Sequence, residues 1–132
     1  MGRWINDRSK EALRRRDADG EAALTCVYCE VELIARAHNS NLAAASLDHL
    51  TPRSAGGALT DPANLVCCCA SCNSRRQDTP LVDWLASIPN GIEAGARIIT
   101  RLNRNANWDR YVAEAKDAGF VTGGKKKKGV KP

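Results

Sequence analysis

The sequence predicts a small α+β domain held together by a metal ion. Two observations favour this fold class: the cysteines fall in two tight clusters, and the apolar pattern changes from a strand period to a helix period after the second cluster. Length is a third observation, because a chain of 132 residues buries only a modest hydrophobic core and gains stability from a cross-link such as a bound metal. We therefore expect an N-terminal helix, two short strands and C-terminal helices around a metal site.

The first expected element is a short arginine-rich helix over residues 7–16. The sequence Asp-Ala-Asp-Gly at 17–20 ends it before the first cysteine pair. Segment 31–45 is ambiguous, because its Ala and Leu content favours a helix whereas Asn-Ser-Asn at 39–41 favours a turn. It is predicted as a short helix or an irregular insert. Two short strands follow, at 45–50 and 65–69, separated by a loop rich in Pro and Gly.

Apolar residues at helical spacing predict three helices after Cys72, over about 80–88, 92–103 and 107–119. Thr79 is expected to cap the first of them, with Pro80 as its first residue. The side chains expected to face the core are Leu81, Trp84, Leu85, Ile88, Ile92, Ile99, Leu102, Trp108, Tyr111, Val112 and Ala115.

These elements predict one domain over residues 1–120, with a core at 24–88 and a helical extension at 89–120. Residues 121–132 form a Lys-rich tail that is expected to be disordered. The tail holds five of the 20 basic residues, so the remaining 15 balance the 15 acidic residues. Any affinity for nucleic acid must then come from local basic clusters and from the tail. No segment is apolar enough to span a bilayer, and we expect a cytoplasmic protein.

The cysteines form two C-x-x-C elements, Cys26 with Cys29 and Cys69 with Cys72. This spacing lets a tight turn present two thiolates to one tetrahedral zinc. Four sulfurs close the coordination sphere, so the zinc is predicted to be structural. Cys67 and Cys68 are spare; on a strand they would point to opposite faces, one of them inward as a small apolar residue.

The segment between the cysteine pairs contains Asp48-His49-Leu50-Thr51-Pro52-Arg53-Ser54-Ala55-Gly56-Gly57, then Asn64-Leu65, and Asn73 directly follows Cys72. Over residues 26–76 this pattern resembles the four-cysteine branch of the HNH endonuclease family. The resemblance implies a ββα-metal (HNH/His-Me finger) core, in which two antiparallel strands and a helix hold one divalent metal.

The resemblance also implies residue roles. His49 would be the general base that takes a proton from the attacking water. Asp48 and Asn73 would hold the catalytic metal, Mg²⁺ or Mn²⁺, through oxygen atoms. Asn64 would tie the loop to the strand and so orient His49.

Three arginines, Arg53, Arg75 and Arg76, are the expected nucleic-acid contacts, because a guanidinium can grip phosphate oxygens with a rigid fork. A solvated helix face is the alternative for Arg75 and Arg76. A second set recurs at helical spacing and is favoured as a solvated face over a DNA-binding track: Arg97, Arg101 and Arg104.

The resulting hypothesis is a metal-dependent DNA endonuclease of a bacterial or phage-infected cell that leaves 3′-hydroxyl and 5′-phosphate ends. Its substrate is expected to be double-stranded DNA. The alternative is a zinc-stabilised DNA-binding module without catalysis, which would need neither His49 nor Asn73.

Overall fold

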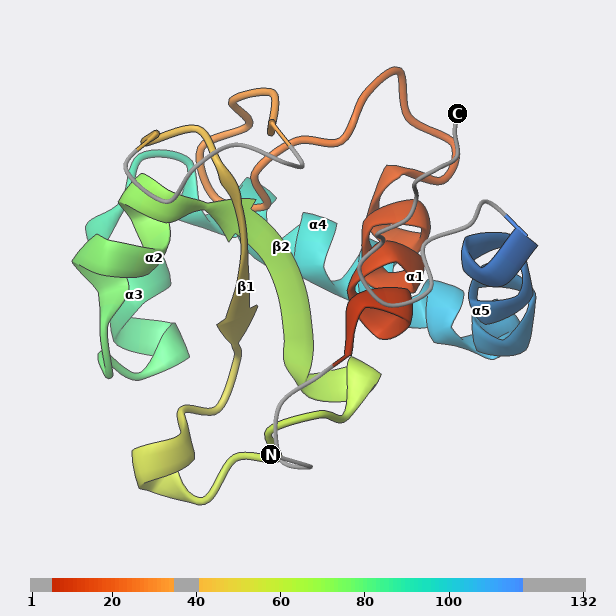
Figure 1. The fold of residues 1–132 in the computed structure, drawn as a ribbon. Helices are drawn as coiled ribbons and strands as arrows, with labels where there is room; N and C mark the ends of the chain where they lie inside the picture. Colours follow the sequence, from red (N-terminus) through yellow and green to blue (C-terminus); the bar gives the residue numbers. More distant parts are fainter. Residues whose placement is uncertain (1–5, 35–40, 118–132) are drawn as a thin grey trace.

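A computed structural model describes residues 6–34 and 41–117, and its elements surround a central β-hairpin (Figure 1). The helices and strands are α1 (Asp7–Ala18), β1 (Ala45–His49), β2 (Leu65–Cys69), α2 (Ala70–Arg76), α3 (Leu81–Ser87), α4 (Gly91–Asn103) and α5 (Trp108–Asp117). Short 3-10 turns lie at Arg53–Ala55, Pro62–Asn64 and Arg104–Asn107. The predicted α+β class is confirmed, and β1, β2 and α2 supply the ββα arrangement.

Strands β1 and β2 pair antiparallel, with Ala45 opposite Cys69 and His49 opposite Leu65. All five residues of β2 are buried, because helices cover it on both sides. The two spare cysteines face different acidic groups, Cys67 near Asp17 and Cys68 near Asp48. Both are therefore inward, whereas the alternation of the strand predicted only one.

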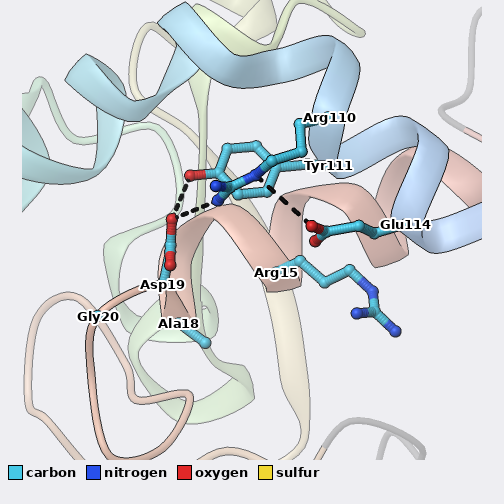
Figure 2. Close-up of a pocket in the computed structure, with 7 residues that line it drawn as sticks. All are labelled: Arg15, Ala18, Asp19, Gly20, Arg110, Tyr111 and Glu114. Atoms are coloured by element: carbon cyan, nitrogen blue, oxygen red, sulfur yellow. Dashed lines mark hydrogen bonds and ion pairs between the residues drawn. The ribbon is translucent and has the colours of Figure 1, made fainter.

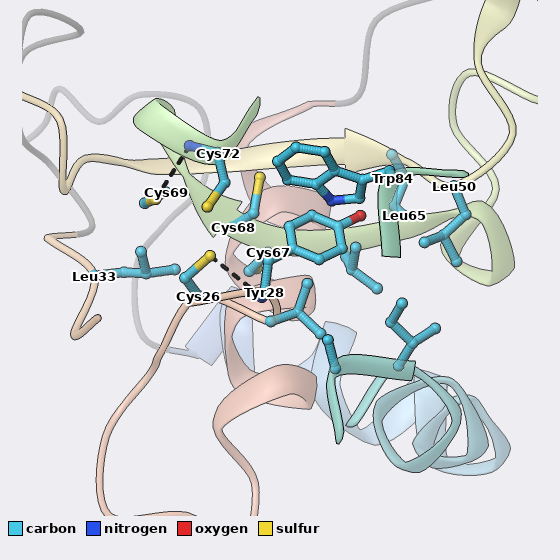
Figure 3. Packing of buried hydrophobic residues seen from close by; sticks show 14 of the residues in the cluster. Cys26, Tyr28, Leu33, Leu50, Leu65, Cys67, Cys68, Cys69, Cys72 and Trp84 are labelled. Atoms are coloured by element: carbon cyan, nitrogen blue, oxygen red, sulfur yellow. Dashed lines mark hydrogen bonds between the residues drawn. The ribbon is translucent and has the colours of Figure 1, made fainter. Parts of the chain in front are cut away.

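The core lies between the hairpin, the first cysteine pair and α3. Tyr28 and Trp84 meet edge to face with ring centroids 5.5 Å apart, beside the clustered cysteines (Figure 3). The predicted N-cap of α3 is wrong by one residue, since the helix begins at Leu81 and Pro80 stands at the cap without a side-chain hydrogen bond.

Helix α4 presents a different face to the core from the one predicted. Ile92 and Ile99 were expected inward, but they are 89% and 62% exposed, while Ile98 and Arg101 are buried. Arg101 can be buried because its guanidinium donates to the Thr25 carbonyl and hydroxyl at 2.9 and 3.0 Å. Hydrogen bonds from its two terminal nitrogens thus let an arginine lie on the inward face of α4, although its Nε has no partner among the described residues.

The first and last described helices, α1 and α5, pack side by side (Figure 1). At the end of α1, Asp19 accepts hydrogen bonds from the Tyr111 hydroxyl at 2.6 Å and from Arg110 at 2.7 Å (Figure 2). The bond from Tyr111 is the main reason that the pKa of Asp19 is lowered, and Arg110 adds to it. These contacts fasten α5 to the N-terminal helix.

The ambiguous segment begins with isolated bridges in place of a helix: Thr25 pairs with Glu32, and Ile34 with Ala44. The predicted domain boundaries stay a prediction, and the Lys-rich tail at 121–132 lies outside the described residues. None of the described helices is both long and apolar enough to cross a membrane.

Candidate functional site

The four predicted zinc ligands come together. The Sγ atoms of Cys26, Cys29, Cys69 and Cys72 all lie within 4.8 Å of one another, and those of Cys29 and Cys69 are 3.7 Å apart. Zn–S bonds of about 2.3 Å in a tetrahedron place sulfurs about 3.8 Å apart. The cluster is therefore compatible with a structural zinc.

Local folding brings these thiols to one point. Cys69 ends β2 and caps α2, where its Sγ accepts a hydrogen bond from the Cys72 amide at 3.3 Å. Cys26 Sγ accepts from the Cys29 amide at 3.5 Å in the facing turn. Burial raises the pKa of the Cys26 thiol to about 11 and also raises that of Cys72, so binding a metal here must displace tightly held protons.

His49 is the last residue of β1, and its ring reaches the loop that joins the two strands. Its Nε2 lies 3.0 Å from the Leu59 carbonyl oxygen, and the side chain is half-buried. A carbonyl only accepts, so in this contact Nε2 carries the hydrogen and the neutral ring keeps Nδ1 as an acceptor. The geometry therefore gives His49 a fixed ring position and one basic nitrogen.

Asn64 closes the same loop at its far end. Its Oδ1 accepts from the Thr51 amide at 2.8 Å, and its Nδ2 donates to the carbonyls of Thr51 and Ala58 at 3.1 and 2.8 Å. Its own carbonyl accepts from the Leu50 amide at 2.9 Å, which continues the hairpin beyond β1. Asn64 thus joins both sides of the loop next to His49.

The loop also requires a glycine at position 57. A Cβ atom there would lie 1.7 Å from the Thr51 carbonyl oxygen and 3.0 Å from Asn64 Nδ2. No side chain fits such a close backbone approach. The two consecutive glycines therefore differ, because Gly56 has a positive φ of 87° but open space around it.

Asp48 precedes His49 and lies in the core at 4% exposure. Its Oδ2 accepts from Arg76 at 2.6 Å and from the Tyr28 hydroxyl. Arg76 is itself fully buried and also donates to the carbonyls of His49 and Leu50 at 3.0 and 2.7 Å. This guanidinium therefore fixes both the carboxylate of Asp48 and the backbone that carries His49.

Asn73 lies on α2 one turn before Arg76, and its Nδ2 donates to the Ser46 hydroxyl at 2.7 Å. Ser46 and Asp48 share a face of β1, because side chains alternate along a strand. Asp48 thus lies on the face of β1 that Asn73 of α2 contacts through Ser46. Each keeps one oxygen, Oδ1, without a hydrogen bond from the described residues. A carboxylate and an amide oxygen fit a hard divalent cation in donor type.

Comparison with protein families agrees with this geometry. Residues 26–79, from the first zinc ligand to the turn after α2, match the family model described as HNH endonuclease. The match covers 54 of the 132 residues and is consistent with an HNH endonuclease family. No curated protein and no solved structure matches the chain.

The arginines predicted to contact nucleic acid around the HNH domain differ in placement. Arg53 and Arg75 are exposed, and the guanidinium of Arg75 lies 5.8 Å from the centroid of the Trp84 ring. Arg76 departs from the prediction, because a fully buried guanidinium with five internal partners has no surface to offer a phosphate. Arg97 and Arg104 also bond inward, to the carbonyls of Val27 and Arg16.

Several residues that support the HNH site were missed in the sequence. Tyr28 lies between the two cysteines of the first C-x-x-C element, and its hydroxyl donates to Asp48. Arg16 and Asp17 were placed in or just after a basic helix, yet both are fully buried. One signal was available: they follow the buried residues Ala12 and Leu13 by one helical turn, so all four share a face.

Proposed function

We propose that this protein is a metal-dependent DNA endonuclease that hydrolyses phosphodiester bonds and leaves 3′-hydroxyl and 5′-phosphate ends. The observation that carries the proposal is the placement of His49 within a family-matched segment. Its ring is held by the Leu59 carbonyl in a loop closed by Asn64. The proposed substrate is double-stranded DNA in the cytoplasm of a bacterial or phage-infected cell.

In this proposal His49 acts as the general base. Its Nδ1 accepts the proton of the attacking water, and the positive ring that results is stabilised because Nε2–H already donates to the Leu59 carbonyl. Asn64 acts on the reaction only indirectly. It holds the loop between the strands, and the shape of this loop sets the orientation of the His49 imidazole. Arg53 and Arg75, both exposed, are the proposed contacts to the DNA backbone.

Asp48 and Asn73 are proposed to hold the catalytic cation through their remaining oxygens, and four cysteines to hold a structural zinc. When bound, Mg²⁺ or Mn²⁺ would offset the negative charge that develops on the phosphate and the leaving oxygen. Arg76 forms an ion pair with the Asp48 carboxylate at 2.6 Å, so it holds this side chain in place.

Plasmid cleavage with purified protein tests the proposal. With Mg²⁺ or Mn²⁺ the wild-type protein should cut DNA, and EDTA should stop it. His49→Ala should lower the cleavage rate by at least about 100-fold, while DNA affinity stays within a few-fold, because a general base acts mainly in the transition state.

The chain's other histidine provides the matched control: His38→Ala should cleave at the wild-type rate. If His49→Ala lost binding and cleavage in parallel, His49 would be structural. If the wild-type protein bound DNA without cutting it under any of these conditions, the non-catalytic DNA-binding module would be the better description.

A further inference from the structure

Arg16, on α1 outside the family-matched segment, is connected to the hairpin that carries the proposed site. Its side chain is fully buried, and each of its three guanidinium nitrogens donates a hydrogen bond. One terminal nitrogen donates to the Pro62 carbonyl at 2.7 Å and to Asn105 Oδ1 at 2.9 Å. The other donates to the Leu65 carbonyl at 2.6 Å, and Nε donates to Asp17 at 2.8 Å.

The two carbonyls that Arg16 binds lie on either side of Asn64. Residues Pro62–Asn64 form a 3-10 turn, and Leu65 begins β2 opposite His49. A planar guanidinium that holds both carbonyls fixes the path of the backbone between them. Arg16 therefore fixes the backbone position from which the Asn64 side chain projects.

From Asn64 the connection to His49 is short. The Asn64 side chain bonds to Thr51 and Ala58, and its carbonyl bonds to the Leu50 amide directly after His49. Ala58 adjoins Leu59, whose carbonyl receives the His49 ring nitrogen. Each link is a hydrogen bond of 2.6 to 3.1 Å or a peptide bond.

The charge of Arg16 is balanced inside the protein. Asp17 is also fully buried; it accepts from Arg16 Nε through Oδ1 and from the Cys67 amide of β2 at 2.7 Å through Oδ2. A buried ion pair adds little net stability, because desolvation offsets most of the attraction. A role in holding backbone geometry accounts for an arginine here better than stability does.

We propose that Arg16 is a positioning residue for the nuclease: it clamps the Pro62 and Leu65 carbonyls and thereby sets, through Asn64, the orientation of the His49 ring. This inference rests on the proposed function of His49. It places one determinant of catalysis in the N-terminal helix, beyond the segment that the family pattern covers.

The test compares Arg16→Lys with Arg104→Gln in the full chain. Lysine keeps the charge beside Asp17 but cannot hold two carbonyls with a planar fork. Arg104 binds the carbonyls of Arg16 and Asp17 and does not contact Pro62 or Leu65, so its replacement perturbs the same helix junction. Zinc content and thermal unfolding establish that each variant is folded at the assay temperature.

We expect Arg16→Lys to lower kcat by about tenfold or more with KM within about threefold, because small misplacements of a catalytic group are costly. Arg104→Gln should keep kcat within about twofold. Nitrogen-15 NMR of the imidazoles gives a second readout that needs no cleavage. The His49 ring signals should move toward a mixture of tautomers in Arg16→Lys and stay unchanged in Arg104→Gln.

Wild-type kcat and an unchanged His49 spectrum in Arg16→Lys would overturn the proposal, as would an equal loss of kcat in Arg104→Gln. If Arg16→Lys does not fold, Arg16→Met combined with Asp17→Asn removes both charges and takes its place. Failure of both to fold while Arg104→Gln folds would assign Arg16 to folding alone. If the wild-type protein cuts no DNA, the proposed function fails, and the NMR comparison still decides whether Arg16 orients His49.

Discussion

At the scale of single residues, the loop beside His49 depends on contacts that leave no room for a side-chain carbon. Replacing Gly57 with alanine should destabilise the protein by about 1–3 kcal/mol or more and abolish cleavage, because the Cβ would overlap the Thr51 carbonyl. Gly56→Ala is the matched control, since only its positive φ is unfavourable and the cost should be about 1 kcal/mol. Urea unfolding and plasmid cleavage measure both; equal effects would contradict the close approach at Gly57.

Single residues also show what the sequence could predict. The clustering of four cysteines follows from their spacing, and the structure brings their sulfur atoms together. The helical face shared with Ala12 and Leu13 marks Arg16, but Arg76 could not be distinguished from the more exposed Arg75 beside it, because an arginine is buried only where carbonyls and carboxylates meet it. Those partners come from elements distant in the sequence, such as Leu65 for Arg16 and Asp48 for Arg76.

At the scale of elements, the cysteine cluster joins the turn at 26–29 to the end of β2 and the start of α2. We predict one zinc per chain, measured by elemental analysis. Cys29→Ser should lose zinc and the cooperative unfolding transition, since small metal-stapled domains often fold only with their metal. Cys29 is the exposed member of the cluster, so its replacement changes the core least.

Cys67→Ala is the control for that experiment, because it removes a buried thiol outside the cluster. It should retain one zinc and unfold cooperatively at a lower temperature. A Cys29→Ser protein with full zinc content and wild-type stability would rule out the four-cysteine site.

Element boundaries were predicted better than element orientation. The two strands lie where alternation and loop residues placed them, apart from one residue at the end of β1. Helix α4 also lies where predicted, but its inward face could not be read from apolar spacing. Arg101 faces inward because Thr25 and Asp17 provide acceptors there, which is a tertiary condition.

At the scale of the whole molecule, net charge is distributed unevenly. The chain carries +5, and the five lysines after Gly124 account for all of it. Deleting residues 125–132 should therefore weaken DNA binding, mainly because fewer counterions are released when the protein binds. The slope of log K against log salt should become shallower by up to about 0.9 for each phosphate that the tail no longer neutralises.

A tail of equal length made of Gly and Ser separates charge from length in that experiment. Zinc content and the cleavage rate at saturating DNA should be the same in all three proteins, because no proposed site residue lies in the tail. An unchanged salt slope would show that these lysines do not bind DNA.

The clamp on the hairpin has a consequence for how the protein is made. Every residue of the family pattern has been synthesised by position 79, yet the hydrogen bonds of the Arg16 guanidinium include one to Asn105, in the turn that follows α4. Chains fold as they leave the ribosome, N-terminal parts first. During translation the cysteine cluster and the hairpin that carries the proposed site can thus form while their support is incomplete. The turn after α4 docks late and α5 docks after it, so a nascent chain holds the whole motif before it holds every contact of Arg16.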